Sequence, residues 1–232
     1  FAPFLSPEYA ITQVPLAGGV TIWMSEGSYI SAGAAVYSRS FASPVVIKAK
    51  PSEEVIISHA SNIYALLFSG VCDNITFENI KFIPLTTSRY IAFSSGSANT
   101  SNIDFIDCTF ETTSTTNENA INFRNTGGQN NNKVKRCTFS DGDGANSILL
   151  TNADGGSYIG NVYNSTRTNT RAFNLSTGCF GTFHLNNNNV TALNLSEGAS
   201  TSLFQMISSL SADAVFNFNK NYIRTSGFPF VL

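Results

Sequence analysis

The stretch NIDFIDCTF, residues 102–110, is followed later in the chain by NKVKRCTF, residues 132–139. Both end in Cys-Thr-Phe after a short alternation of apolar and polar residues. An alternation with period two is typical of a β-strand that buries one face. The matching cysteines, Cys108 and Cys137, therefore mark either a chemical feature or equivalent positions of an internal repeat.

Further copies of this pattern favour the repeat. They are ITFENIKF (75–82), GSYIGNVY (156–163), FHLNNNNV (183–190) and FNFNKNYI (216–223). A second set of apolar-x-apolar segments follows four of the copies, at 91–93, 121–123, 148–150 and 173–175. The last apolar residue of the copies falls at positions 82, 110, 139, 163, 190 and 223, a drifting period that is typical of stacked repeats.

The repeats predict an all-β fold, because apolar residues nowhere keep helical spacing over three turns. Short inward-outward strands joined by turns fit a right-handed parallel β-helix, a solenoid of about eight coils with three short strands each. We expect residues 1–17 to form an N-terminal cap and residues 18–232 to form the β-helix. The C-terminal SGFPFVL is apolar, so we expect more chain, a partner or a neighbouring subunit to cover it.

Alignment of the copies predicts that Cys108 and Cys137 occupy one inward slot in neighbouring coils, with Ile80 before them and Val162 after them. A disulfide is sterically allowed there, but packed reduced thiols are the preferred interpretation, since neighbouring copies fill the slot with apolar residues. In the run of four asparagines at 186–189, we expect at least one to stack inward at a corner.

Composition limits the function classes. Charged residues make up 12% of the chain and the net charge is -2, so no nucleic-acid partner is expected. No apolar run is long enough for membrane insertion. The four cysteines are scattered without a C-x-x-C motif, which argues against a zinc ribbon or a thioredoxin-type site. The chain begins at Phe1 without a signal-like segment, which suggests a processed product or an excised domain.

Three runs near the start carry a resemblance to a known superfamily. They are GGVTIWMSEGSYIS (18–31), SPVVIKAKPSEEVIIS (43–58) and LLFSGVCDNITFENIKF (66–82). They resemble the opening coils of pectate-lyase-like β-helix proteins, especially the chondroitinase-B and alginate-lyase branch, and phage tailspikes share the feature. The resemblance implies an extracellular or cell-surface protein, but similar coils occur in lyases, hydrolases, epimerases and adhesins alike.

The alternation places Asp104 and Asp107 outward, with Lys133 and Arg136 beside them one coil later. As a functional patch, Asp104, Asp107 and Lys133 are candidates for binding an acidic polysaccharide. The alternative is an ion-pair ladder on the surface, worth well under about 1 kcal/mol per pair.

A uronate lyase needs a cation or calcium against the substrate carboxylate and a base for the C5 proton. Arg124, Lys135 and Arg136 are the catalytic candidates. The DGDG turn offers Asp141 and Asp143 as calcium ligands, with a plain glycine turn as the alternative. No other cofactor is expected.

Other chemistries have weaker signals. A glycoside hydrolase would need two facing carboxylates, for which Asp104 with Asp107, or Asp141 with Asp143, are the candidates. The two histidines are predicted at a strand end (His59) and facing outward in mid-strand (His184), too far apart for a triad or a zinc site. Outward aromatic residues could stack on sugars; the candidates are Trp23, Tyr37, Tyr64 and Tyr90, and the alternative is that some of them belong to the cap or the core.

Two functions remain open from the sequence. The first is an extracellular protein that binds, and in its stronger form cleaves, an acidic polysaccharide. The second is a non-catalytic surface, fibre or adhesin protein whose helix is a rod and whose ends make homo-oligomer or fibre contacts.

Overall fold

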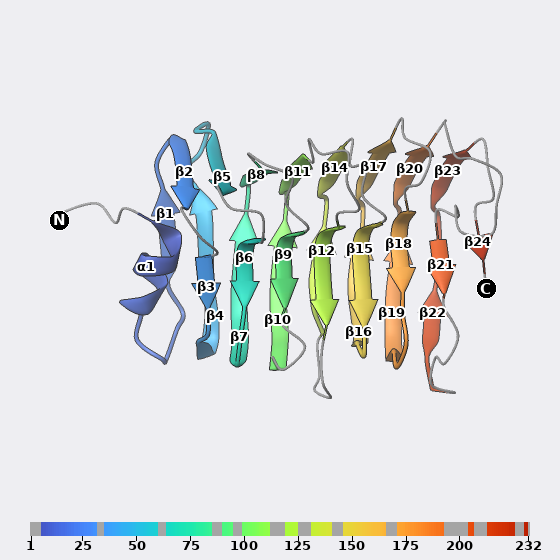
Figure 1. Cartoon of the computed structure of the whole chain (residues 1–232), viewed down its shortest axis with the longest axis horizontal. Helices are drawn as coiled ribbons and strands as arrows, with labels where there is room; N and C mark the ends of the chain where they lie inside the picture. Colours follow the sequence, from blue (N-terminus) through green and yellow to red (C-terminus); the bar gives the residue numbers. More distant parts are fainter. Residues whose placement is uncertain are drawn as a thin grey trace.

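The chain is described from a computed structural model over residues 6–31, 35–59, 64–84, 90–94, 99–111, 119–124, 131–140, 146–165, 171–192, 204–206, 213–225 and 230–231. Short strands stack along the long axis, with the chain termini at opposite ends (Figure 1). Every strand pairing is parallel, and neighbours within a sheet are always three strands apart in the chain. The predicted all-β parallel β-helix is therefore confirmed as the fold class.

In the described residues, three sheets of eight strands each form the walls of the helix. The first sheet contains β1 (Thr21–Met24), β4 (Ser40–Ala49), β7 (Val71–Glu78), β10 (Asn99–Ile106), β13 (Lys133–Lys135), β16 (Asp154–Ile159), β19 (Phe180–Asn186) and β22 (Val215–Asn217). The second contains β2 (Gly27–Ser31), β5 (Val55–His59), β8 (Lys81–Pro84), β11 (Thr109–Glu111), β14 (Thr138–Ser140), β17 (Val162–Ser165), β20 (Asn189–Ala192) and β23 (Tyr222–Thr225). The third contains β3 (Ala35–Tyr37), β6 (Tyr64–Phe68), β9 (Tyr90–Ser94), β12 (Asn119–Arg124), β15 (Asn146–Thr151), β18 (Arg171–Leu175), β21 (Phe204–Met206) and β24 (Phe230–Val231).

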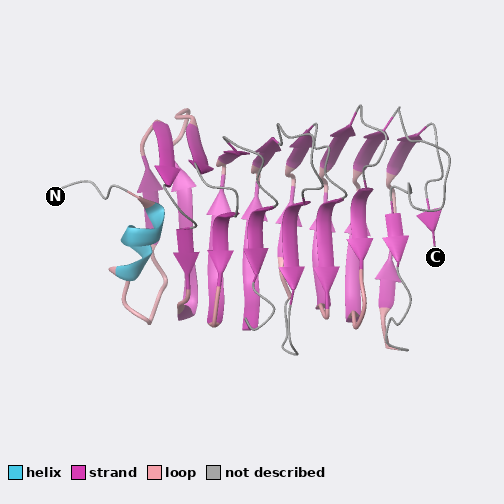
Figure 2. Cartoon of the chain, viewed as in Figure 1, coloured by secondary structure: helices cyan, strands magenta, loops and turns pink. Residues whose placement is uncertain are grey.

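One short helix, α1 (Pro7–Thr12), lies within the segment predicted as a cap. Figure 2 shows it at the N-terminal end of the strand stack, where it contacts β1 and β3. Ser6 caps this helix, since its side chain accepts a hydrogen bond from the backbone N–H of Tyr9. The rest of the described structure consists of strands, turns and connecting segments.

Aromatic stacks run along the core. Phe82, Phe110, Phe139 and Tyr163 occupy one inward column of the second sheet, and successive ring centroids are 5.1, 4.9 and 4.9 Å apart. Parallel in-register pairing places equivalent residues of neighbouring coils one above the other, which explains why the repeat conserves a ring at this position. The buried phenylalanines, among them Phe77, Phe105 and Phe123, thus build the interior.

The corner between the first and second sheets has one left-handed residue in each of six successive coils. These residues, with φ between 53° and 70°, are Asn79, Asp107, Arg136, Gly160, Asn187 and Lys220. The residue after each of them turns into the core. Each of these coils therefore needs one left-handed residue to turn this corner. A non-glycine residue at that position is strained by about 1–2 kcal/mol.

The inward slot after this corner corrects one prediction. Ile80, Cys108 and Cys137 share the slot as expected, but Val162 pairs with Thr138 on β14, so Asn161 follows Cys137. The four cysteines are buried free thiols, which confirms the packed-thiol interpretation. The slot changes from apolar to amide because Asn161 Oδ1 accepts the backbone N–H of Cys137 at 2.9 Å.

Asparagines then continue the slot as a hydrogen-bonded ladder. Asn188 Oδ1 accepts the backbone N–H of Asn161, and Asn221 Oδ1 accepts that of Asn188, both at 2.9 Å. Each amide nitrogen donates to a main-chain oxygen: Asn161 to Val134, Asn188 to Tyr158 and Asn221 to Leu185. The expectation that one asparagine of the 186–189 run stacks inward is confirmed by Asn188, which is 3% exposed.

Candidate functional site

The outward face of the first sheet carries a continuous row of polar side chains. Strand register aligns Asp104, Lys133, Ser157, His184 and Asn217 on β10, β13, β16, β19 and β22. Neighbouring members are one strand spacing apart, about 4.8 Å. We call these five residues the polar row.

Asp104 and Lys133 form the contact that the sequence predicted. Asp104 Oδ1 accepts the backbone N–H of Lys133 at 3.1 Å, and Lys133 Nζ lies 3.2 Å from Asp104 Oδ2. Asp104 is 9% exposed, and burial raises the pKa of its carboxyl group because the loss of hydration outweighs the attraction of Lys133. The ion pair is thus partly shielded from water, and the carboxylate of Asp104 is its buried member.

Asp107 and Arg136 also meet as predicted, at the left-handed corner just beyond the strands. Arg136 donates from Nε and from a terminal nitrogen to the two oxygens of Asp107, each at 2.7 Å. Hydrogen bonding to Asp107 raises the pKa of Arg136. The guanidinium therefore stays charged and engaged, which suits it to carboxylate recognition better than to proton abstraction.

Lys135 lies between these two pairs in the chain and differs from both. Its register partners are Ile106 on β10 and Ile159 on β16. Within the described residues it forms no ion pair, whereas Lys48, Lys81, Lys133 and Arg136 each do. Its charge acts on Asp104 as a minor influence that lowers the carboxyl pKa. Lys135 is therefore a cation on this face that is free to meet an anionic ligand.

The structure does not bring all the predicted residues together. Arg124 is the exposed last residue of β12, in the third sheet, so it lies on a different wall from Lys135 and Arg136. Asp141 and Asp143, the predicted calcium ligands, lie outside the described residues. No group of three or more His, Cys, Asp or Glu side chains that could hold a metal ion occurs in the part of the chain that the structure describes.

Of the aromatic residues predicted to face outward, Tyr37 is buried and Trp23 is exposed. Tyr37 is fully buried, so its prediction as an outward residue is wrong; its ring packs against Phe68 and Phe77, with centroids 5.7 and 5.6 Å away. Trp23 is 49% exposed, and Lys48 Nζ lies 4.6 Å from the centre of the Trp23 ring. Trp23, Lys48, Glu78, Ile106 and Lys135 follow one another in register on the first sheet.

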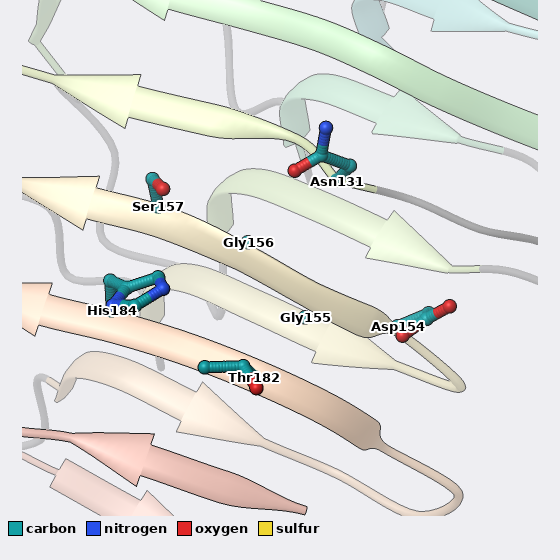
Figure 3. Close-up of a pocket in the computed structure, with 7 residues that line it drawn as sticks. All are labelled: Asn131, Asp154, Gly155, Gly156, Ser157, Thr182 and His184. Atoms are coloured by element: carbon teal, nitrogen blue, oxygen red, sulfur yellow. The ribbon is translucent and has the colours of Figure 1, made fainter.

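A pocket of about 390 Å³ opens on the same sheet. Its lining consists of Asn131, Asp154, Gly155, Gly156, Ser157, Thr182 and His184. Figure 3 shows Ser157 beside His184 at one end, Asp154 toward the other end, and the two glycines between. The pocket thus includes two members of the polar row.

A bulge forms the floor of this pocket. The pairing of β16 with β19 shifts register between Asp154 and Gly156. Gly155 has φ +61°, and a Cβ there would lie 2.5 Å from the carbonyl oxygen of Thr182; at Gly156 it would lie 2.8 Å from that of Asn132. Only glycine fits both positions, and the result is bare backbone between polar side chains.

Sequence reasoning placed His184 correctly as outward and in mid-strand, and His59 at a strand end, but it missed this pocket. The available signal was the pair Gly155–Gly156 inside a strand pattern, which indicates a bulge or a close approach of backbone. Compared with known proteins, the chain matches no family model and no curated sequence. Among the described residues, no helix is long and apolar enough to span a membrane.

Proposed function

We propose that this chain is an extracellular or cell-surface β-helix protein of the pectate-lyase-like kind that binds an acidic polysaccharide across its first sheet. The observation that carries the proposal is Lys135, an ammonium group without an ion pair among the described residues, on the outward face of the first sheet beside the Asp104–Lys133 and Asp107–Arg136 pairs. A uronate carboxylate would supply the missing charge partner.

The surroundings of Lys135 support a sugar as the ligand. Ile106 and Ile159, both half-buried, flank it and offer apolar contact to the faces of pyranose rings. Asp104, Asp107 and Lys133 would then act mainly by fixing the shape and charge of the surface, because each already has a partner. Exposed Trp23, on the same column, adds a stacking surface nearer the N-terminal end.

Cleavage by β-elimination is the stronger form of the proposal. In it, Arg136 or bound calcium would neutralise the uronate, and Lys135 in its uncharged form would take the C5 proton. The glycosidic oxygen would leave C4 and take up a proton as the C4–C5 double bond forms. Arg124 could take part only if the ligand also reached the third sheet, where this residue lies. Incubation with pectate, alginate or chondroitin, with calcium or with a chelator, should then produce the ultraviolet absorbance of an unsaturated uronate; its absence leaves binding as the function.

Binding itself is tested with Lys135→Ala. Removing one charged hydrogen-bond partner should weaken affinity for an acidic glycan about tenfold or more, with a reduced dependence on salt. Lys81→Ala is the matched control, since Lys81 lies on the second sheet and contacts Glu111 at 2.8 Å. Equal affinities of the two variants would refute the proposed role of this face.

A second function is favoured by a separate observation. Near the C-terminal end of the stack, Val215, Phe218 and Tyr222 are 50%, 37% and 61% exposed. Strands β22 and β23 end their sheets in the described structure. Exposed apolar residues on unpaired edges suit end-to-end contacts in a homo-oligomer or fibre. Self-association that Tyr222→Lys abolishes, together with silence across a glycan panel, would favour this non-catalytic rod.

A further inference from the structure

We infer that the pocket formed by Asn131, Asp154–Ser157, Thr182 and His184 is a subsite for an uncharged sugar ring, so that the glycan carries a neutral residue beside its acidic one. The inference rests on the proposed function and narrows its substrate class. It concerns residues that none of the predicted site positions include.

The shape of the pocket supports a ring. Its volume of about 390 Å³ lies within the usual range of about 300–1,000 Å³ for small-molecule sites. The Gly155–Gly156 bulge leaves its floor without side chains, and polar groups stand around that floor (Figure 3). A flat ring can therefore approach the backbone while its hydroxyl groups meet the surrounding side chains.

The chemistry of the lining favours hydroxyl groups over a carboxylate. The Asp154 carboxylate receives no hydrogen bond from a side chain among the described residues, and its Oδ1 occupies the space that a Cβ on Gly181 would take. An ionised carboxylate only accepts hydrogen bonds, so it suits a pair of sugar hydroxyls and repels a uronate. Ser157 and Thr182 add hydroxyls that donate and accept.

His184 contributes a directed donor to this set. The amide nitrogen of Asn217 lies 3.2 Å from His184 Nδ1. An amide nitrogen only donates; in the tautomer whose Nδ1 accepts this hydrogen bond, Nε2 carries the ring proton and can donate to a ligand. The pocket thus combines an acceptor at Asp154 with a donor at His184, which matches the hydroxyls of a neutral pyranose.

Lys135 and the pocket are close enough for two adjoining sugars of one ligand. Lys135 pairs with Ile159, two residues beyond Ser157 on β16. With strands about 4.8 Å apart and about 3.3 Å per residue, the Cα atoms of Lys135 and Ser157 are about 8 Å apart. One ligand can therefore place its carboxylate at Lys135 and an adjoining neutral ring in the pocket.

The test compares three polymers: unsulfated chondroitin, in which a uronate alternates with an uncharged sugar; pectate, which consists of uronate; and neutral dextran. Wild type should bind chondroitin more tightly than pectate and should not retain dextran alone. Asp154→Asn, which keeps the side-chain shape, should weaken chondroitin binding about tenfold and should leave pectate binding unchanged or make it tighter, because the amide no longer repels a uronate. Lys135→Ala should weaken binding to both acidic polymers.

The controls separate the two proposals. Glu54→Gln removes an exposed charge elsewhere and should change neither affinity. Ser157→Ala provides a second pocket variant, and thermal unfolding of each variant checks that it is folded. If Asp154→Asn and Ser157→Ala affect neither polymer, or both equally, the subsite is wrong while acidic-glycan binding stands. If wild type binds none of the polymers, both proposals are overturned.

Discussion

The asparagine ladder gives the sharpest prediction about stability, through Asn188→Ala. Asn188 is buried and contacts two neighbouring coils. Its Oδ1 accepts from the backbone N–H and Nδ2 of Asn161, at 2.9 and 3.2 Å, while its Nδ2 donates to Tyr158 O and Asn221 Oδ1, at 3.0 and 2.9 Å. The side chain thus satisfies main-chain groups that have no access to water.

The magnitude follows from the groups left without a partner. Asn161 Nδ2 keeps its bond to Val134 O, and Asn221 Oδ1 keeps the backbone N–H of Asn188. The N–H of Asn161 and the bond to Tyr158 O are lost, and each costs about 1–3 kcal/mol when buried. We therefore expect the free energy of unfolding to fall by about 2–6 kcal/mol, a large share of the stability of an ordinary domain.

Asn189→Ala is the matched control, because it removes the adjacent asparagine. Asn189 is exposed and makes no side-chain hydrogen bond among the described residues, so its loss should change the free energy of unfolding by about 0.5 kcal/mol or less. Urea unfolding followed by circular dichroism measures both variants, and unchanged m-values would show that the comparison is valid. If Asn188→Ala is no more destabilised than Asn189→Ala, the ladder does not stabilise these coils.

Two further predictions concern ionisation. Because the pKa of Asp104 is raised in the fold, the folded state binds the proton of this carboxyl group more tightly than the unfolded chain does. Relative to Asp104→Asn, wild type should therefore lose stability as pH rises from about 3.9 through the folded pKa. Urea titrations across this pH window measure the difference, and a relative gain of stability by wild type would contradict the prediction. Burial raises the pKa of Cys72 to about 12, and all four cysteines are at most 1% exposed. The native protein should therefore resist thiol alkylation at neutral pH and react fully only when it is unfolded. Mass spectrometry measures the extent of alkylation in both states. Rapid labelling of the native protein would show that the coils open.

The polar face illustrates how far local rules reach. The period-two alternation and the repeat length were enough to predict that Asp104 meets Lys133 and Asp107 meets Arg136, since parallel in-register strands place equivalent residues side by side. The same rules could not predict that Asp104 is buried, because that depends on how closely neighbouring side chains cover it. Nor could they predict that Lys135 lacks an ion pair in the described structure.

By itself, the sequence determined the fold class and most of the inward and outward positions of the strands, and it favoured packed thiols over a disulfide at Cys108 and Cys137. Those properties follow from the period-two alternation, which recurs in every repeat. Only the tertiary structure decided that Asn161, rather than Val162, fills the slot after Cys137, since an inward amide is favoured by main-chain groups of another coil. It also decided the glycine-floored pocket, because that pocket arises from a register shift between strands that are adjacent in space and separated in sequence.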